Sequence, residues 1–227
     1  LYDFLFDNCS TRLRDIVARN AEDTVSFKNI VGADPPTFRQ MIHEYLERGK
    51  QFWSKLGIDM LLGSKIDRPV RNEEAMFLPD YLMKGFDSAV ISNRPLVLKK
   101  ETVLPADNSS ANSAGWFRPI VATILLLVIF GSLQFIRSRN AVIALKIFDR
   151  VFFFILGALG FLMLFMWFGT DHVVCRNNYN LLWALPTHLP MAFLISHHKN
   201  WVKSYFAVMA VWYFLLFFAW AIIPQDM

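Results

Sequence analysis

Hydrophobic positions divide the chain into a mixed first half and an almost uncharged second half. In the first half apolar residues alternate with charged ones, often at helical spacing, whereas the second half holds four apolar stretches of 18, 18, 16 and 19 residues. A membrane-spanning helix needs about 17 to 25 such residues. The stretches are 119–136, 151–168, 181–196 and 205–223. We therefore expect an α-helical transmembrane bundle of four spans, the alternative being the buried helical core of a soluble protein.

The third stretch, 181–196, is the weakest of the predicted spans. It contains Pro186, His188 and Pro190, and proline breaks a helix unless neighbouring helices satisfy the freed backbone groups. A histidine within a span is costly unless it faces the bundle interior or a cavity. His188 is therefore expected either to line a lipid or acyl path or to hydrogen-bond a neighbouring helix.

Charge is distributed as unevenly as hydrophobicity. Lys and Arg number 23 against 19 Asp and Glu, and 55% of the 227 residues are hydrophobic. Residues 1–115 hold 15 basic and 16 acidic side chains, whereas residues 116–227 hold 8 and 3. A basic excess placed between hydrophobic runs is typical of membrane orientation and not of nucleic-acid binding. We therefore expect the membrane as a partner and exclude nucleic acid.

The basic residues near the spans predict which way the chain faces. Six of them fall on one side of the predicted membrane and two on the other. The six are Arg137, Arg139, Lys146, Arg150, Lys199 and Lys203, and the two are Arg118 and Arg176. Because positive charge favours cytoplasmic loops, the soluble part and the loop 169–180 are expected on the non-cytoplasmic face.

The first half is predicted to be an α+β domain covering residues 1–106. A linker rich in Ser and Asn, 107–115, joins it to the membrane domain 116–227. A strand is expected at Tyr2–Phe6 and a β-hairpin at 90–91 and 96–98. Helices are expected at about 9–19, from Thr37 onward, at 52–62, and from 72 to 83 with a break at Pro79.

Cys9 stands where the first predicted strand meets the first predicted helix. Unpaired backbone N–H groups and the positive end of the helix dipole favour a thiolate there, which makes Cys9 a candidate catalytic nucleophile. The same N–H groups are suited to hold an oxyanion. Against this, a lone cysteine is more often a small buried residue. A disulfide with Cys175 is a further alternative.

Three stretches of the sequence resemble the pattern of the Lnb-type domain found in Bacteroidetes membrane proteins. The first is YDFLFDNCSTRLRD at 2–15, which carries Cys9. The second is LGSKIDRP at 62–69 with EAMFLPDYL at 74–82, and the third is TDH at 170–172 with NLLW at 180–183. The stretches together span most of the chain.

The resemblance implies a partial papain-like, permuted cysteine fold in the periplasm, attached to the inner (cytoplasmic) membrane. It also implies lipoprotein N-acylation, in which Cys9 takes an acyl chain from a phospholipid donor as a thioester and passes it to the N-terminal cysteine amine of a lipoprotein acceptor. In permuted papain-like folds the partner histidine precedes the cysteine, and no histidine precedes Cys9 here. We therefore expect a piece that lacks both ends, whose base lies upstream of Leu1, and which is inactive by itself.

Four other residues are candidates for a substrate or base role. Arg12 and Arg14 either form local ion pairs or bind a phospholipid phosphate through bidentate contacts. His172, beside Asp171 in the loop expected on the same face as Cys9, either orients substrate, serves as a base or is simply solvated. No metal or organic cofactor is indicated.

Two other functions stay open at this point. One is a membrane-anchored cysteine peptidase or amidase that uses the same nucleophile on a peptide or cell-wall bond. The other is a non-catalytic membrane scaffold whose cysteine is merely buried. The adduct trapped on Cys9 separates the two enzymes, and the effect of replacing Cys9 separates both from the scaffold.

Overall fold

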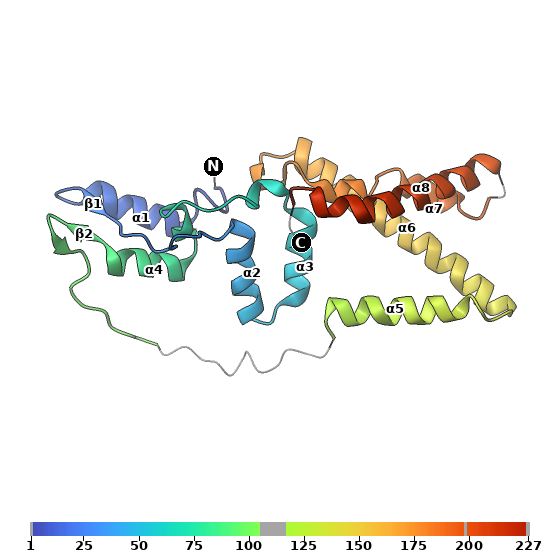
Figure 1. Cartoon of the computed structure of the whole chain (residues 1–227), viewed down its shortest axis with the longest axis horizontal. Coiled ribbons are helices and arrows are strands. Elements are labelled where there is room, and N and C mark those ends of the chain that lie inside the picture. The colour runs from blue at the N-terminus through green and yellow to red at the C-terminus, as the bar shows by residue number, and fades with distance from the viewer. Residues whose placement is uncertain (1, 105–116, 198, 226–227) are drawn as a thin grey trace. The chain divides into compact units, whose positions relative to one another are not determined.

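The structure, a computed structural model, describes residues 2–104, 117–197 and 199–225 (Figure 1). Contacts divide the chain into two compact units. The first unit comprises Leu1–Tyr45 with Asp67–Asn112, and the second comprises Leu46–Ile66 with Ser113–Met227. Grouping of Leu46–Ile66 with the membrane half was not indicated by the sequence. The predicted linker 107–115 lies outside the described residues, and the predicted domain limits stay a prediction.

Helices of the first unit largely follow the sequence pattern. They are α1 (Cys9–Asn20), α2 (Phe38–Arg48), η2 (Glu74–Phe77) and α4 (Pro79–Ser88). The predicted break at Pro79 is confirmed, because Leu78 is extended and Pro79 opens α4. Proline suits that position, where its missing N–H has no helical partner to lose.

The strand predicted at Tyr2–Phe6 is wrong. These residues form a turn closed by a backbone bridge between Asp3 and Asp7. The Asp3 carboxylate accepts from the backbone N–H groups of Leu5 and Phe6, both at 2.9 Å. An aspartate whose side chain accepts from nearby backbone N–H groups favours a turn over a strand. Residues 2–6 therefore form a turn and not the predicted strand.

The only sheet in the part of the chain that the structure describes is small and antiparallel, in the order β1 (Val25–Ser26), β2 (Val90–Ile91) and β3 (Arg94–Pro95). The predicted hairpin is confirmed, although its second strand is Arg94–Pro95 and not 96–98. Ser92 and Asn93 both have positive φ, 48° and 62°, which is the geometry of a two-residue hairpin turn. β1 was not predicted, because two residues carry no periodicity.

The core of the first unit forms around Phe38 at the start of α2. Phe38 is fully buried and packs against Phe77, with ring centroids 5.4 Å apart. The guanidinium of Arg68 lies 4.9 Å from the centroid of the Phe38 ring. Beside them Arg39, 1% exposed, pairs with the Asp67 carboxylate at 2.5 and 3.2 Å. This buried pair connects α2 to residue 67. Removal of either partner would leave the other charge buried without compensation, which is strongly destabilising.

The second unit is helical. Its longer helices are α3 (Phe52–Leu61), α5 (Pro119–Leu133), α6 (Arg139–Phe168), α7 (His188–Leu194) and α8 (Asn200–Ala219). Its short 3₁₀ turns are η1 (Ser64–Ile66), η4 (Val173–Cys175), η5 (Tyr179–Leu182) and η6 (Trp220–Ile222). The helix predicted at 52–62 is confirmed by α3.

Two helical segments of the described chain are long and apolar enough to cross a membrane, Arg139–Phe168 and Asn200–Ile222. The first predicted span is a helix of 15 residues, α5, and the third is split into η5, a non-helical stretch and the seven-residue α7. The predicted count of four spans is therefore not confirmed by helix length. Pro186 and Pro190 account for the split, since neither can continue a helical hydrogen-bond ladder.

A notch on α6 receives this split stretch. A Cβ added to Gly160 would lie 1.9 Å from the carbonyl oxygen of Ala184, and one added to Gly157 would lie 2.1 Å from the backbone nitrogen of Leu189. Small residues allow helices and backbone to approach closely within membranes. Non-helical backbone is tolerated at membrane depth where protein covers it, and α6 supplies that cover.

Contacts within the second unit define the two ends of the bundle. At one end Arg150 Nη2 donates to Ser196 Oγ at 3.2 Å, so that α6 at Arg150 contacts the end of the stretch 181–196. At the other end Trp53 Nε1 donates to the carbonyl of Phe117 at 2.9 Å. α3 therefore lies at the end where the first span begins.

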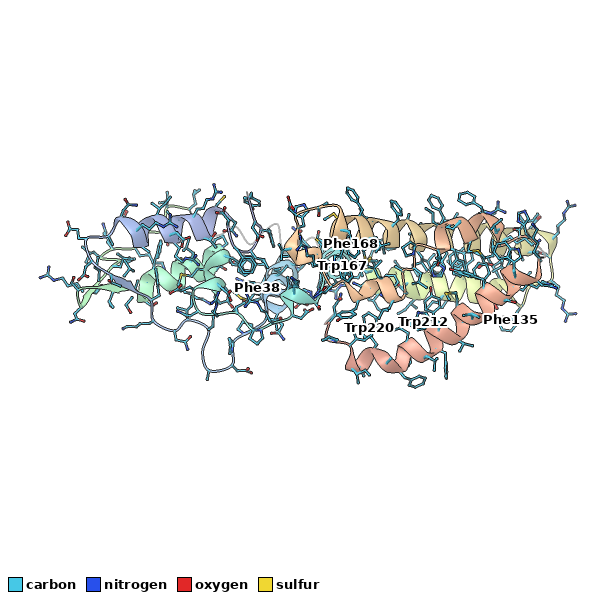
Figure 2. All side chains as sticks on the ribbon, turned by 90° about the horizontal axis from the view of Figure 1, so that it is seen from above. Phe38, Phe135, Trp167, Phe168, Trp212 and Trp220 are labelled. Carbon is cyan, nitrogen blue, oxygen red and sulfur yellow. The ribbon has the colours of Figure 1, made fainter. Side chains whose placement is uncertain are left out.

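Aromatic side chains project from the membrane helices (Figure 2). Trp167 and Phe168 stack at the end of α6, with ring centroids 5.1 Å apart. Phe217 on α8 is 78% exposed, among many exposed apolar residues of α5, α6 and α8. Large exposed apolar surfaces are unusual for a soluble protein, so these faces suit a hydrocarbon environment.

Candidate functional site

Cys9 is the first residue of α1, and its thiol is free and exposed. Asn8 caps the helix: its side chain accepts from the Thr11 backbone N–H at 3.0 Å, and the Thr11 hydroxyl accepts from the Asn8 N–H at 2.8 Å. Such a reciprocal box satisfies two N–H groups at the start of a helix. The predicted helix start beside the cysteine is confirmed, and the alternative of a buried Cys9 is wrong.

The cap also anchors the cysteine-bearing turn to the core. Asn8 is 8% exposed, and its Nδ2 donates to the carbonyls of Phe4 and Phe77, both at 2.9 Å. Phe77 ends η2, so a single amide connects the start of α1 to the segment before α4. The thiol is therefore exposed on a rigid support.

Two backbone N–H groups beside the thiol have no partner among the described residues. The N–H of Thr11 goes to the Asn8 side chain and that of Arg12 to the Asn8 carbonyl at 2.9 Å. The N–H groups of Cys9 and Ser10 make no hydrogen bond within residues 2–104. Unpaired donors at a helix N-terminus attract negative charge, and here they lie next to the sulfur.

Arg12 and Arg14, the two predicted basic candidates, are both engaged by carboxylates. Arg12 pairs bidentately with Asp7 at 2.6 and 2.9 Å, and the hydrogen bond from Arg12 lowers the pKa of the Asp7 carboxyl. Arg14 pairs with Asp15 at 2.7 Å and donates to the carbonyl of Glu73 at 2.6 Å. These are the local ion pairs that the sequence allowed for.

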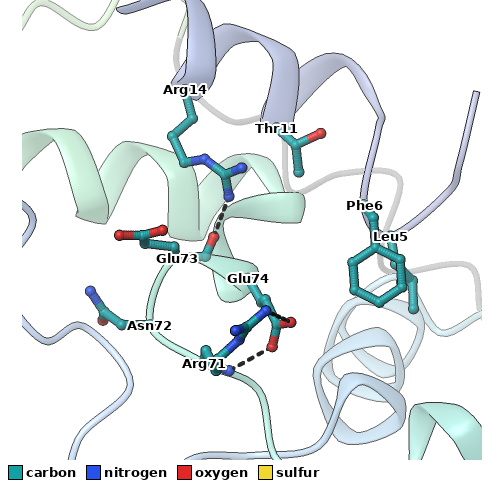
Figure 3. Close-up of a pocket in the computed structure, with 8 residues that line it drawn as sticks. All are labelled: Leu5, Phe6, Thr11, Arg14, Arg71, Asn72, Glu73 and Glu74. Carbon is teal, nitrogen blue, oxygen red and sulfur yellow. Dashed lines mark hydrogen bonds and ion pairs between the residues drawn. The ribbon is translucent and has the colours of Figure 1, made fainter. Parts of the chain in front are cut away.

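A cavity of about 450 Å³ lies beside α1 in the first unit (Figure 3). It reaches the cysteine-bearing helix at Thr11, and Cys9 itself does not line it. Two basic and two acidic side chains lie in its wall, together with apolar ones. The lining residues are Leu5, Phe6, Thr11, Arg14, Arg71, Asn72, Glu73 and Glu74. The pocket is a polar recess on one side of α1.

Glu74 organises the floor of this pocket. It is 8% exposed and accepts from Arg68 at 2.7 and 2.8 Å and from Arg71 at 2.9 Å. The hydrogen bond from Arg68 is the largest cause that lowers the pKa of the Glu74 carboxyl from 4.5 to about 2. Arg68 and Glu74 both lie in the second stretch that carries the family resemblance, and the sequence does not predict that Glu74 lines a pocket.

His172 and Asp171 lie in the second unit, just before η4. Both are exposed, and among the described residues no hydrogen bond joins their side chains. The His172 backbone N–H donates to Thr170 Oγ1 at 3.3 Å, and its carbonyl accepts from Cys175 at 3.0 Å. Their adjacency in sequence therefore does not form an aspartate–histidine pair in this structure.

Cys175 differs from Cys9 in exposure. It is free, 3% exposed, and its burial raises the pKa of the thiol. The alternative of a disulfide with Cys9 is therefore not realised in this structure. An inert, buried thiol of this kind serves packing.

An amide cluster holds the end of α3 to the loop after α6. Asn180, fully buried, donates to the carbonyls of Asp59 and Met60 at 2.8 and 3.1 Å, and Asn178 donates to Met60 at 2.8 Å. The Tyr179 N–H donates to the side chain of Gln225 at 2.7 Å. No sequence pattern predicts this contact, because single asparagines far apart in the chain show no periodicity.

His188 hydrogen-bonds a neighbouring helix, the second of the two predicted alternatives. It is fully buried; its Nε2 contacts the hydroxyl of Tyr213, and its Nδ1 lies 2.7 Å from the hydroxyl of Tyr205. Tyr213 donates to the carbonyl of Trp183 at 2.8 Å, so its oxygen accepts from His188. Nε2 of His188 therefore carries a proton in this contact. The tyrosines were not predicted as partners.

Within the described ranges no group of three or more His, Cys, Asp or Glu side chains could hold a metal ion. A capped, exposed thiol on the first unit and long apolar helices in the second indicate a membrane protein with a candidate nucleophile. The family model described as the Lnb transmembrane domain matches residues 110–227, just over half of the chain. The chain therefore belongs to the Lnb family of membrane proteins. No curated protein and no solved structure matches it.

Proposed function

We propose that this protein is a lipoprotein N-acyltransferase that carries the acyl chain as a thioester on Cys9. The observation that carries the proposal is the exposed thiol of Cys9 at a capped helix start, in a chain of the Lnb family. The acyl donor is a phospholipid of the membrane, and the acceptor is the N-terminal cysteine amine of a lipoprotein.

The reaction consists of two displacements at one carbonyl carbon. First the Cys9 thiolate attacks the phospholipid ester, a C–S bond forms, and the C–O bond to glycerol breaks; the glycerol oxygen takes up the proton that the thiol gave up. Then the lipoprotein amine attacks the thioester, a C–N bond forms, and the C–S bond breaks. The proton that the amine loses passes to the departing sulfur, which restores the Cys9 thiol.

The free N–H groups of Cys9 and Ser10 support this chemistry, because each displacement passes through a tetrahedral oxyanion. Donors already oriented toward the developing charge contribute about 2.7 to 4 kcal/mol each in enzymes that use them. The first turn of α1 supplies the nucleophile and the donors together. Anchoring of the turn through Asn8 keeps their relative geometry fixed.

Other parts of the proposal rest on the sequence. The first unit belongs to a papain-like permuted fold in the periplasm, and the membrane half lies in the inner membrane with its basic loops in the cytoplasm. Asp171 and His172 serve as substrate-orienting or base residues. Arg12 and Arg14 hold the cysteine-bearing helix, and a phosphate would have to displace a carboxylate to reach either of them.

Mass spectrometry of Cys9 tests the function. The full-length protein is incubated in vesicles of a palmitoyl phospholipid, quenched with acid and digested, and the peptide carrying Cys9 is weighed. We expect a palmitoyl thioester that hydroxylamine removes and that a lipoprotein peptide with a free N-terminal cysteine discharges. A peptidyl adduct in its place would indicate the peptidase or amidase.

Cys9→Ser is the matched variant in cells, and Cys175→Ser is its control. Cys9→Ser is expected to abolish N-acylation of lipoproteins, whereas Cys175→Ser leaves the reaction intact because that thiol is buried. Unchanged acylation in Cys9→Ser would leave the scaffold as the better description.

A further inference from the structure

An apolar groove of about 630 Å³ runs along the first unit between α1, α4 and the extended segment 97–104. α1 and α4 lie side by side in Figure 1. The floor of the groove is built from aliphatic and aromatic side chains, and charged residues lie in the segment that borders the groove. The lining residues are Leu13, Pro79, Leu82, Met83, Phe86, Asp87, Val97, Lys99, Lys100, Glu101, Thr102, Val103 and Leu104. The volume falls in the range of small-molecule sites.

The groove begins on the helix face that carries the nucleophile. Leu13, its only residue on α1, stands four positions after Cys9, so the two side chains are neighbours on one face, about 6 Å apart at Cβ. Pro79, at the start of α4, follows two residues after Phe77, whose carbonyl holds the Asn8 amide. The groove thus opens beside the capped turn of Cys9.

The groove and the polar pocket touch α1 at different residues. The pocket of Figure 3 contacts α1 at Thr11 and Arg14, whereas the groove contacts it at Leu13. The charges beside the groove are already neutralised, since Lys100 pairs with Asp87 at 2.6 Å. A ligand gains little there from charge and much from hydrocarbon contact.

We propose that this groove holds the acyl chain that Cys9 carries as a thioester. The proposal rests on the proposed function, since only an acylated Cys9 places a chain there. The alkyl chain of a thioester on Cys9 is stabilised when it is buried away from water. On the face of α1 that carries Cys9, the apolar groove begins at Leu13. The groove then sets the preferred chain length, while the polar pocket is left for the polar part of a substrate.

Met83→Trp tests this assignment by filling the groove. Met83 lines the groove and is 46% exposed, so a larger side chain is tolerated by the fold. The full-length protein is offered an equal mixture of palmitoyl and hexanoyl phospholipids, and the two Cys9 thioesters are quantified by mass. We expect the palmitoyl to hexanoyl ratio to fall at least about tenfold, the factor for lost contact of roughly two methylene groups.

Ala18→Trp is the matched control, because Ala18 lies on α1, is exposed, and does not line the groove. It is expected to leave the ratio unchanged. Leu104→Asp gives a second, independent variant: Leu104 is 84% exposed, so a charge there leaves folding intact and is expected to lower the same ratio.

The outcomes separate the two proposals. If wild-type Cys9 is acylated and neither Met83→Trp nor Leu104→Asp changes the ratio, the groove does not hold the chain and the acyltransferase proposal stands. If a peptidyl group occupies Cys9, or no phospholipid acylates it, both proposals fall. A change in Ala18→Trp equal to that in Met83→Trp would also overturn the assignment, because the effect would not be local.

Discussion

The side-chain amide of Asn8 donates to the carbonyl of Phe77 at 2.9 Å, across 69 positions of sequence. This contact ties the turn that presents Cys9 to the end of η2, and so to Pro79, which lines the apolar groove. One hydrogen bond therefore positions the turn that carries Cys9 and its unpaired N–H donors relative to the proposed chain site.

Replacement of Asn8 is expected to lower both stability and acylation. Asn8→Ala removes the cap and both donated hydrogen bonds, and loss of a cap costs about 0.5 to 2 kcal/mol, with a similar cost for the carbonyl of Phe77 left without its partner. The stability is checked by thermal unfolding of the first unit, with hydrogen exchange of peptides covering α1 as the measured signal. The rate of Cys9 thioester formation checks the geometry.

Asn8→Asp is the informative partner of that variant. It keeps the oxygen that accepts from the Thr11 N–H but loses the donor to Phe77. The helix is expected to start normally while the turn detaches from η2. Equal acylation in Asn8→Asp and wild type would show that anchoring to Phe77 is not needed.

The two thiols are expected to react at very different rates with a water-soluble maleimide. Cys9 is exposed, whereas Cys175 is 3% exposed and its pKa is raised by burial. Labelling of Cys175 requires local opening, and an opening free energy of roughly 3 kcal/mol makes it at least about a hundredfold slower. Peptide mapping after timed labelling at neutral pH provides the measurement. Fast modification of Cys175 would contradict the packing of η4.

Acid is expected to weaken the first unit through Glu74. Its pKa is lowered from 4.5 to about 2, so the stability that it contributes is fully present above about pH 5 and is lost as the pH falls toward 2. A shift of this size corresponds to roughly 3 kcal/mol. Hydrogen exchange of peptides covering 68–78, corrected for intrinsic rates, is expected to show falling protection between these limits.

Glu74→Gln provides the reference for the acid effect. The amide keeps the volume of the side chain but does not titrate, and it gives up the charge that two arginines share. Protection in this variant should be lower near neutral pH and should change little with acid. If the protection of the wild-type protein changed as little with pH as that of Glu74→Gln, the titration of Glu74 would not account for acid weakening of the first unit.

Local signals in the sequence predicted most helices of the first unit, and tertiary contacts decided the rest. The helix start beside Cys9 and the break at Pro79 were predictable because caps and prolines act on their immediate neighbours. The turn at Asp3 was missed because alternating aromatic residues resemble a strand. The partners of Asn180 lie about 120 positions away, and nothing local announces a contact of that range.

In the membrane half, too, local signals were predictable from the sequence and tertiary contacts were not. Apolar length predicted where the chain enters the bundle, and prolines predicted the weakness of the third stretch, but neither indicated that 181–196 would be split around a seven-residue helix. The place of Cys9 at a helix start was predictable from the polar residues around it. The groove was not, because its wall combines Leu13 with Met83 and Leu104 from separate segments.

Gly160 is expected to be among the least replaceable residues of the membrane half. A methyl group at this position would lie 1.9 Å from the Ala184 carbonyl oxygen, a backbone atom that cannot turn aside. Gly160→Ala must therefore push the split stretch off α6, at a cost of about 1 to 3 kcal/mol, and expose backbone groups to lipid. The midpoint of thermal unfolding in detergent is expected to fall by several degrees.

Gly131→Ala on α5 is the control for that experiment. No atom lies within 4 Å of a Cβ added there, and alanine favours a helix over glycine by about 1 kcal/mol, so its unfolding midpoint should stay equal or rise. The contrast isolates the steric notch from the general effect of removing a glycine. If Gly160→Ala and Gly131→Ala unfold at the same temperature, the close approach of Ala184 to α6 is not what holds the broken stretch in the bundle.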